Sequence, residues 1–314
     1  MSRPVVALTG ASGFIGRRLA PLLAADGWRV RLLLRRDPVL PEWRGMEPQI
    51  VAGDLRDAGA LRALLSGVDA VVHVAGLIKA ARQEQYEAVN HAGSRSLAGM
   101  LHEVAPAARL LHLSTLAARE PQLSGYAASK RAGEDAVREL LGERVTVLRP
   151  PAVYGPGDRE TLVFFQMARK SVVPLLGRPD ARAAMIHVDD LCALMVALVR
   201  EPAGGQVLAA ADARPQGYTW REVFGTAARA VGNSRARFVH APAPLLRTLA
   251  FGGDVARLFG VANMLTTQKL RELRHPDWSV HAHEHARPAG WAPRHDLAEG
   301  FAGAVAWYRR TGWL

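Results

Sequence analysis

Short apolar runs alternate with longer amphipathic stretches through the first half of the chain. The apolar runs are rich in valine and leucine and lack a polar face, which is typical of strands buried on both sides of a parallel sheet. They are predicted at Val5–Leu8, Val30–Leu34, Gln49–Ala52, Ala70–Val74, Leu110–Leu113 and Val145–Leu148. Apolar positions with helical spacing fill the gaps, at Arg17–Ala25, Ala58–Leu65, Gln83–Val104 and Ala127–Leu141. This alternation predicts a doubly wound parallel α/β sheet of the Rossmann type, with ligands beyond the carboxyl ends of its strands.

The pattern changes after Pro150, where prolines and glycines interrupt the apolar runs. Single helices are predicted at Leu162–Lys170 and Asp189–Arg200, a further sheet strand at Gln206–Ala209, and a mainly helical tail with turns near Gly232-Asn233, Gly252-Gly253 and Gly290. We therefore expect a discontinuous dinucleotide-binding domain, residues 1–158 and 184–212. A smaller, mainly helical substrate domain would comprise residues 159–183 and 213–314.

The turn after the first predicted strand carries glycines in the spacing Gly-x-x-Gly-x-x-Gly. Gly10 would permit the tight turn, Gly13 would let backbone N–H groups approach a pyrophosphate, and Gly16 would allow close packing of the following helix. The positive end of that helix favours phosphate, whereas the alternative is an ordinary turn. The loop predicts cofactor contacts from Gly10, Ser12, Gly13, Phe14, Ile15 and Gly16.

Tyr126 and Lys130 lie four positions apart in a predicted helix, so they share one face. A lysine ammonium beside a phenol favours the phenolate, and we expect it to lower the pKa of Tyr126 below its usual value near 10. A tyrosine tuned in this way can pass a proton to or from a carbinol oxygen at neutral pH. The alternative is a solvated surface pair.

Composition narrows the class of protein. The 314 residues are 49% hydrophobic and 22% charged, as expected of a globular enzyme. The net charge is +11, but the arginines are scattered along the chain without a basic stripe, so we do not predict nucleic-acid binding. The single cysteine, Cys192, excludes a disulfide framework and favours a reducing, cytoplasmic location. No signal peptide and no transmembrane segment are expected.

Two further features are open to a functional and a structural interpretation. His281, His283 and His285 alternate and could share one face of a strand, but we predict no metal site there. The apolar stretch Leu245–Leu265, broken by Gly252-Gly253, could be a membrane-surface helix. We favour a helix that covers the substrate pocket or a dimer face.

The glycine loop and the Tyr126/Lys130 pair together resemble the extended branch of the short-chain dehydrogenase/reductase superfamily, the NAD(P)-dependent epimerase/dehydratase proteins. The likeness is greatest to members similar to dihydroflavonol reductase and 3β-hydroxysteroid dehydrogenase. It extends over nearly the whole chain and includes Gly53-Asp54-Leu55, His73-Val74-Ala75-Gly76, Asn90, Arg149-Pro150 with Val153-Tyr154-Gly155-Pro156-Gly157-Asp158, and Ile186-His187-Val188-Asp189-Asp190.

The resemblance implies roles for particular residues. Thr115, with Ser114 as the second choice, would hydrogen-bond the substrate oxygen, Tyr126 would be the acid/base, and Lys130 would hold the nicotinamide ribose. Further cofactor contacts are implied for Asp54, Leu55, Val74, Ala75, Gly76, Lys130, Pro150 and Val153.

The end of the second predicted strand bears on cofactor choice. NAD-preferring enzymes usually carry an acidic residue there, which accepts hydrogen bonds from the ribose 2′-OH. This chain has Arg35 and Arg36 instead, poised to bind a 2′-phosphate. The turn Arg36-Asp37-Pro38 resembles that of dihydroflavonol reductases. We therefore expect NADP(H) to be favoured over NAD(H).

Departures from the nucleotide-sugar enzymes indicate the reaction. Leu116 and Ala117 stand where the dehydratases carry an acidic pair, and Ala152 stands where epimerases commonly carry an asparagine. We therefore favour an oxidoreductase that interconverts a ketone and a secondary alcohol of a small or moderately apolar molecule. An NAD(P)-retaining nucleotide-sugar epimerase and a non-catalytic nucleotide-binding accessory subunit are the alternatives. The superfamily also suggests a homodimer.

Overall fold

The fold is described from a computed structural model, which covers residues 3–36, 40–258 and 265–314. Asp37 and Pro38 of the predicted cofactor turn lie outside the described residues, as do residues 259–264 of the predicted apolar stretch.

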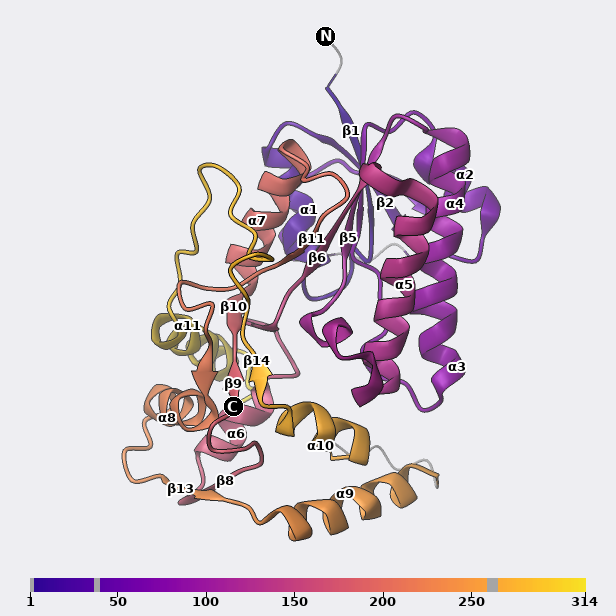
Figure 1. The fold of residues 1–314 in the computed structure, drawn as a ribbon. Coiled ribbons are helices and arrows are strands. Elements are labelled where there is room, and N and C mark those ends of the chain that lie inside the picture. The colour runs from indigo at the N-terminus through magenta and orange to yellow at the C-terminus, as the bar shows by residue number, and fades with distance from the viewer. Residues whose placement is uncertain (1–2, 37–39, 259–264) are drawn as a thin grey trace.

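Seven parallel strands form the main sheet, in the order β11-β6-β5-β4-β1-β2-β3 (Figure 1). Their bounds are β1 Val5–Thr9, β2 Arg29–Leu34, β3 Gln49–Ala52, β4 Ala70–His73, β5 Arg109–Leu113, β6 Val145–Arg149 and β11 Val207–Ala209. The strands predicted from the apolar runs are confirmed to within one residue at each end. The order reverses between β1 and β4, which is where ligands bind in sheets of this topology.

Helices cover both faces of this sheet (Figure 1). Helices α1 (Gly16–Ala25) and α7 (Val188–Arg200) pack on one face, and α2 (Ala58–Leu65), α4 (Ser94–Val104) and α5 (Gly125–Leu141) on the other. Successive side chains of β1 point to opposite faces of the sheet. Leu8 packs in the core between the sheet and α1, and Ala7 packs in the core between the sheet and helices α2 and α4. The predicted fold class is confirmed.

The helix predicted over Gln83–Val104 is divided in the structure. It consists of α3 (Gln83–Tyr86), a π-helix (Glu87–Gly93) and α4. In the wider π turn the carbonyl oxygen of Asn90 accepts a hydrogen bond from Ser94 Oγ at 2.8 Å. The Asn90 side chain points inward, and this arrangement could not be expected from apolar periodicity because both kinds of helix bury one face.

The remaining elements pack together below the main sheet (Figure 1), and we call this part of the molecule the second layer. Helices α6 (Leu162–Ala168), α8 (Trp220–Val231) and α11 (Leu297–Arg310) pack around Phe165, Phe301 and Tyr308. Small sheets join β7 (Ala152–Tyr154) to β10 (Met185–His187), β8 (Val172–Leu175) to β13 (Arg237–His240), and β9 (Arg182–Ala183) to both β12 (Tyr218–Thr219) and β14 (Asp277–Trp278). Short 3-10 turns occur at Pro41–Trp43, Leu116–Arg119, Pro121–Leu123 and Gly142–Arg144.

Helix α9 (Ala243–Leu258) corrects one prediction, because it continues through Gly252-Gly253 without a break. Leu246 and Ala250 of α9 pack against Leu270 of α10 (Thr267–Arg274), so tertiary burial outweighs the low helix propensity of glycine. A second correction concerns His281 and His283, which lie outside any strand, in a turn-rich segment. No helix among the described residues has the length and apolar character needed to cross a bilayer.

Candidate active site

The glycine loop between β1 and α1 has no room for side chains at two of its positions. Gly10 has a φ of +73°, and a Cβ added there would lie 2.5 Å from the backbone nitrogen of Ala75. A Cβ at Gly16 would lie 2.2 Å from the carbonyl oxygen of Gly10, so the close approach is to the loop itself. Because these positions carry no side chains, the loop can pack tightly and present its backbone to a dinucleotide phosphate at the start of α1.

The segment after β4 lies directly beside the glycine loop. The backbone nitrogens of Val74 and Ala75 donate to the carbonyl and hydroxyl of Thr9, at 3.2 and 3.3 Å. The Thr9 hydroxyl is also 2.6 Å from Nδ1 of the buried His73. Burial and the charge of Lys130 lower the pKa of His73 to about 3, so the imidazole is neutral. Val74, Ala75 and Gly76 are thus held where the strand order reverses.

The arginines at the end of β2 are accessible to a ligand. Arg35 and Arg36 are exposed, and Arg35 is close enough to Asp54 to lower the pKa of its carboxyl. The larger cause of that lowered pKa is Arg56, whose Nη2 is 2.7 Å from Asp54 Oδ2. The predicted cofactor residue Leu55 has its side chain in the core under α2 and α4, where it contacts Gly93.

Asn90 connects the segment after β4 to the helix that carries the predicted catalytic pair. Its Oδ1 accepts from the backbone nitrogen of Leu77 at 2.7 Å, and its Nδ2 donates to the carbonyl of Leu77 and to Ser129 Oγ, each at 3.0 Å. The side chain is buried, so its hydrogen bonds fix the position of that segment relative to α5.

Helix α5 begins after Ser124, whose hydroxyl accepts from the backbone nitrogen of Ala127 at 3.0 Å. Helical spacing places Tyr126, Lys130 and Glu134 in one row. Lys130 Nζ donates to the carbonyl of Leu113 at the end of β5, at 2.7 Å. It lies beside Gly76, where an added Cβ would be 3.5 Å away. Burial lowers the pKa of Lys130 to about 8, and the carboxylate of Glu134 opposes this shift.

Tyr126 departs from the expectation for its pKa. Burial raises the pKa of Tyr126 to about 12, a hydrogen bond with the Thr115 side chain opposes the rise, and Glu272 and Tyr86 add to it. The expected lowering of the Tyr126 pKa by Lys130 is therefore wrong. The reason is that desolvation of the phenol dominates, and the Lys130 ammonium is directed to the carbonyl of Leu113.

The hydrogen bond to Tyr126 distinguishes the two hydroxyls at the end of β5. Thr115 reaches the phenol and also accepts from the backbone nitrogen of Ala117 at 3.3 Å. Ser114 is buried, and its Oγ has no hydrogen-bond partner among the described residues. Thr115 is thus brought together with Tyr126, while Ser114 lies alongside.

A segment that sequence reasoning did not connect to the site reaches it from the second layer. Glu272 of α10 accepts a hydrogen bond from Ser124 Oγ, and Gln268 Oε1 accepts from the backbone nitrogen of Gly125 at 3.2 Å. These bonds place α10 over the first turn of the helix that carries Tyr126. The residues are far from α5 in sequence, and no motif marks them.

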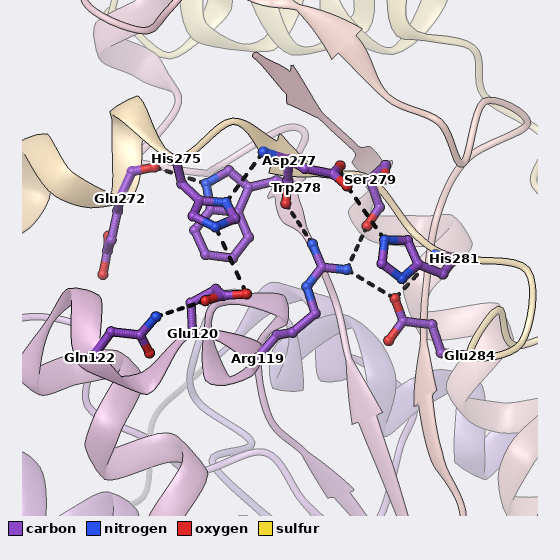
Figure 2. A network of polar contacts seen from close by, with 10 residues as sticks. All are labelled: Arg119, Glu120, Gln122, Glu272, His275, Asp277, Trp278, Ser279, His281 and Glu284. Atoms are coloured by element: carbon purple, nitrogen blue, oxygen red, sulfur yellow. Dashed lines mark hydrogen bonds and ion pairs between the residues drawn. The ribbon is translucent and has the colours of Figure 1, made fainter.

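Figure 2 shows the polar network that continues from Glu272 of α10 to Arg119 and Glu284. Arg119 donates to the carbonyl oxygens of Asp277 and Ser279, at 2.6 and 3.0 Å, and to Glu284 Oε1 at 3.1 Å. Glu284 and Arg119 are both largely buried, so this pair is shielded from salt and water. The network fixes the turn after Thr115 to the second layer.

An open cavity of about 330 Å³ lies beside the glycine loop. It is lined by residues of that loop, of the segment after β4, of residues 157–160 and of the C-terminal part of the chain: Phe14, Arg17, Ile78, Gly157, Asp158, Arg159, Glu160, Trp307 and Trp313. The exposed ion pair between Lys79 and Glu160, at 2.7 Å, links two of these segments. The predicted contacts Pro150 and Val153 follow β6; Pro150 is buried, and its carbonyl accepts from Leu116.

Comparison with known proteins identifies the family. A model of the NAD dependent epimerase/dehydratase family matches residues 6–210. The chain belongs to this family. It is 46% identical to a ceramide reductase from Caulobacter vibrioides, over 100% of this chain and 97% of that protein. It is 26% identical to the 4-hydroxy-2-methyl-3-oxo-4-farnesyl-3,4-dihydroquinoline-1-oxide ketoreductase of Stigmatella aurantiaca, over 66% of this chain and 68% of that protein.

A solved structure shows the same fold. The dTDP-glucose 4,6-dehydratase DesIV from Streptomyces venezuelae, with NAD and TYD bound, matches with a TM-score of 0.73 at 24% identity, over 98% of each chain. The resemblance to the extended short-chain dehydrogenase/reductase superfamily is confirmed, and with it the prediction of an NAD(P)-dependent enzyme. The 46% identical relative that covers the whole chain is named a reductase, which favours an enzyme over the alternative of a non-catalytic accessory subunit.

Outside the predicted site, two residues of the segment Ile186–Asp190 and a distant histidine lie close together. His187, Asp189 and His295 offer ligand atoms within 4.8 Å of one another. The imidazoles are stacked, with centroids 3.9 Å apart and planes 25° apart, so their in-plane lone pairs run alongside each other and do not converge. Arg18 Nε lies 3.3 Å from Asp189 Oδ1 and already balances its charge. We assign no metal to this group.

Proposed function

We propose that this protein is an NADP(H)-dependent oxidoreductase that interconverts a ketone and a secondary alcohol, with Tyr126 as the acid/base. Two observations support the proposal: the Thr115 side chain interacts with Tyr126, and Lys130, one turn further along α5, lies at the end of β5 beside Gly76. Full-length similarity to a protein named ceramide reductase supports the same reaction type.

Each of the three side chains has a separate task in ketone reduction. When bound, the nicotinamide supplies the hydride for the carbonyl carbon. Tyr126 Oη donates its proton to the carbonyl oxygen, and Thr115 Oγ1 donates a hydrogen bond to the same oxygen, so the developing negative charge is stabilised. A pKa of about 12 keeps Tyr126 protonated at neutral pH, which suits the acid role in the reducing direction.

Lys130 is suited to hold the cofactor ribose. It lies beside Gly76, and Glu134 faces it from the next turn of α5. Glu134 is bound in turn by Arg149, whose Nε is 2.8 Å from Glu134 Oε1. This arrangement retains a counter-ion for the buried ammonium, so its charge persists near neutral pH.

A preference for NADP(H) is supported by the end of β2. Arg35 and Arg36 are exposed, and no ion pair engages either within the part of the chain that the structure describes. Guanidinium groups form strong charge-assisted hydrogen bonds to phosphate oxygens. Asp54 lies near Arg35 and is paired with Arg56, which reduces its repulsion of a 2′-phosphate.

The substrate we infer is a ketone on a long-chain, ceramide-like lipid. The inference is drawn from the 46% identical relative and from the farnesyl-bearing substrate in the name of the second relative. The epimerase alternative has less support. Ala152 stands where the resemblance implies the asparagine of a nucleotide-sugar epimerase, and an alanine side chain supplies no hydrogen bond to a nucleotide diphosphate.

The direct test is turnover with a synthetic 3-keto ceramide. Consumption of NADPH in proportion to alcohol formed, faster than with NADH, is the expected result. Epimerisation of a UDP-sugar without net cofactor consumption, and no reduction of the ketone, would overturn the proposal. The domain boundaries, the homodimer and the cytoplasmic location stay predictions; the buried thiol of Cys192 is compatible with a reducing compartment.

A further inference from the structure

One end of the molecule gathers exposed apolar side chains that the active site does not use. Leu245, Leu249 and Phe251 of α9 are 53%, 53% and 68% exposed, and Val172 and Val239 are 53% and 52% exposed. They account for most of the large exposed apolar residues in the described chain, whose other members are Leu22, Ile50 and Ile78. Exposed apolar side chains gathered on neighbouring elements are typical of an interaction surface.

These residues belong to elements that adjoin. β13 leads directly into α9, and the two lie along the end of the molecule farthest from the N-terminus (Figure 1). In the β8–β13 pair, Val172 lies opposite Arg237, and both are exposed. Leu246 and Ala250 occupy the buried side of α9. Leu245 and Leu249, four residues apart, share one flank of the helix, and Phe251 lies nearer the side opposite the core. We call the exposed side of α9, β8 and β13 the α9 surface.

The α9 surface is basic as well as apolar. Arg237 of β13 and Arg247 of α9 are exposed cations of this surface, and Arg169, Lys170 and Arg235 are exposed in the segments that lead into β8 and β13. Residues 169–176 and 233–253 contain no aspartate or glutamate. Within the described part of the chain, none of these five cations forms an ion pair with an acidic side chain, so their charge is available to a partner.

We infer that the α9 surface docks on the headgroup region of an anionic phospholipid bilayer. Aliphatic and phenyl side chains on a helix that lies in the interface enter the acyl boundary, while surrounding arginines and lysines meet lipid phosphates. The partner must therefore offer both an apolar region and negative charge. A purely apolar partner would leave the cations without counter-ions, and a purely anionic partner would leave Leu245, Leu249 and Phe251 without an apolar contact.

Other partners fit this surface less well. A second copy of the chain pairing through the same surface would bring two groups of five unpaired cations together, which is repulsive. A nucleic acid would use the cations, but of the five exposed apolar side chains only Phe251 offers a planar group on which a base stacks, and the four aliphatic side chains would be left without a partner. An anionic bilayer satisfies both the charge and the apolar side chains.

Docking would place the catalytic helix close to the membrane. The inner side of α9 packs on α10, and α10 contacts the first turn of α5 through Gln268 and Glu272. A bilayer under α9 is thus separated from the segment that carries Tyr126 by these two helices. The inference is independent of the proposed reaction, since lipid binding is measured without turnover.

The test is co-sedimentation of the full-length protein with phospholipid vesicles. We expect binding to vesicles of phosphatidylcholine with phosphatidylglycerol, at least tenfold weaker binding to phosphatidylcholine alone, and weakening with salt. The variant Leu245→Ser/Leu249→Ser/Phe251→Ser should lose at least tenfold in affinity. Arg235→Gln/Arg237→Gln/Arg247→Gln should lose the preference for the anionic lipid.

The matched control is Leu22→Ser/Ile50→Ser. It removes two apolar side chains, each 40% exposed, from α1 and β3 in the part of the molecule that contains the main sheet. It should bind vesicles like the wild type, and thermal unfolding should show all variants folded. Equal binding by the α9 and control variants, or no binding to anionic vesicles, would overturn the inference. So would tighter binding to a DNA duplex, or a wild-type dimer in solution that the α9 variant converts to a monomer.

Discussion

At the scale of single residues, burial outweighs neighbouring charge at the predicted catalytic pair. Desolvation raises the pKa of Tyr126 to about 12 and lowers the pKa of Lys130 to about 8. Both shifts favour the neutral form, as burial of any ionisable group does. Sequence spacing could place these side chains on one face of α5, but it could not tell that Lys130 would turn to the carbonyl of Leu113.

Cofactor choice is a prediction at this scale. Arg35→Ala and Arg36→Ala should each weaken NADPH binding about 10- to 150-fold, because each removes a charge-assisted hydrogen bond of about 1.5–3 kcal/mol. NADH binding should change less than twofold, since it lacks the 2′-phosphate. Fluorescence titration with both cofactors measures this. Arg29→Ala, at the exposed opposite end of β2, is the control, and equal losses for NADPH and NADH in the test variants would contradict the assignment.

At the scale of secondary-structure elements, local sequence patterns predicted the helices and strands that they specify directly. They missed features that depend on contacts between residues far apart in the sequence. The strands of the main sheet follow from their apolar runs and α2 follows from its helical spacing, and even β3, which is mostly exposed, was found in this way. The π-helix at Asn90 depends on contacts with Leu77 and Ser129, which no local pattern contains. The continuity of α9 through Gly252-Gly253 depends on α10. The motif residues of the site were found by their spacing, but Glu272 has no such signal.

The π-helix gives a prediction of its own. Asn90→Ala should lower the free energy of unfolding by about 3 kcal/mol, because it leaves the buried Ser129 hydroxyl and the half-buried backbone of Leu77 without their hydrogen bonds to Asn90. It should also weaken cofactor binding, since the segment after β4 loses its tie to α5. Urea unfolding and NADPH titration measure the two effects. Asn233→Ala, which removes bonds to Ala168 and Lys170 in the second layer, should lower stability without weakening cofactor binding.

At the scale of the whole molecule, two buried histidines link stability to pH. Burial lowers the pKa of His73 to about 3 and that of His112 well below its usual value of 6.5. Between pH 6.5 and about 3 the unfolded chain protonates His73 while the native protein does not, so stability is lost as the pH falls through this window.

The expected slope is about 1.4 kcal/mol per pH unit for each such histidine. Denaturant unfolding at a series of pH values measures it. His73→Gln should reduce the slope, whereas His283→Gln, at an exposed position, should leave it unchanged. A slope in His73→Gln equal to that of the wild type would show that His73 is not the linked group.

The most direct test of the proposed chemistry is kcat for ketone reduction by Tyr126→Phe with saturating NADPH. The account predicts a loss of at least about 100-fold, because general acid catalysis contributes on the order of 10²–10⁴, with NADPH affinity changed less than twofold. Tyr218→Phe, which removes a hydroxyl bound to Asp212 away from Thr115 and Lys130, should retain activity. A Tyr126→Phe enzyme that reduces the ketone within fivefold of the wild-type rate would contradict the account.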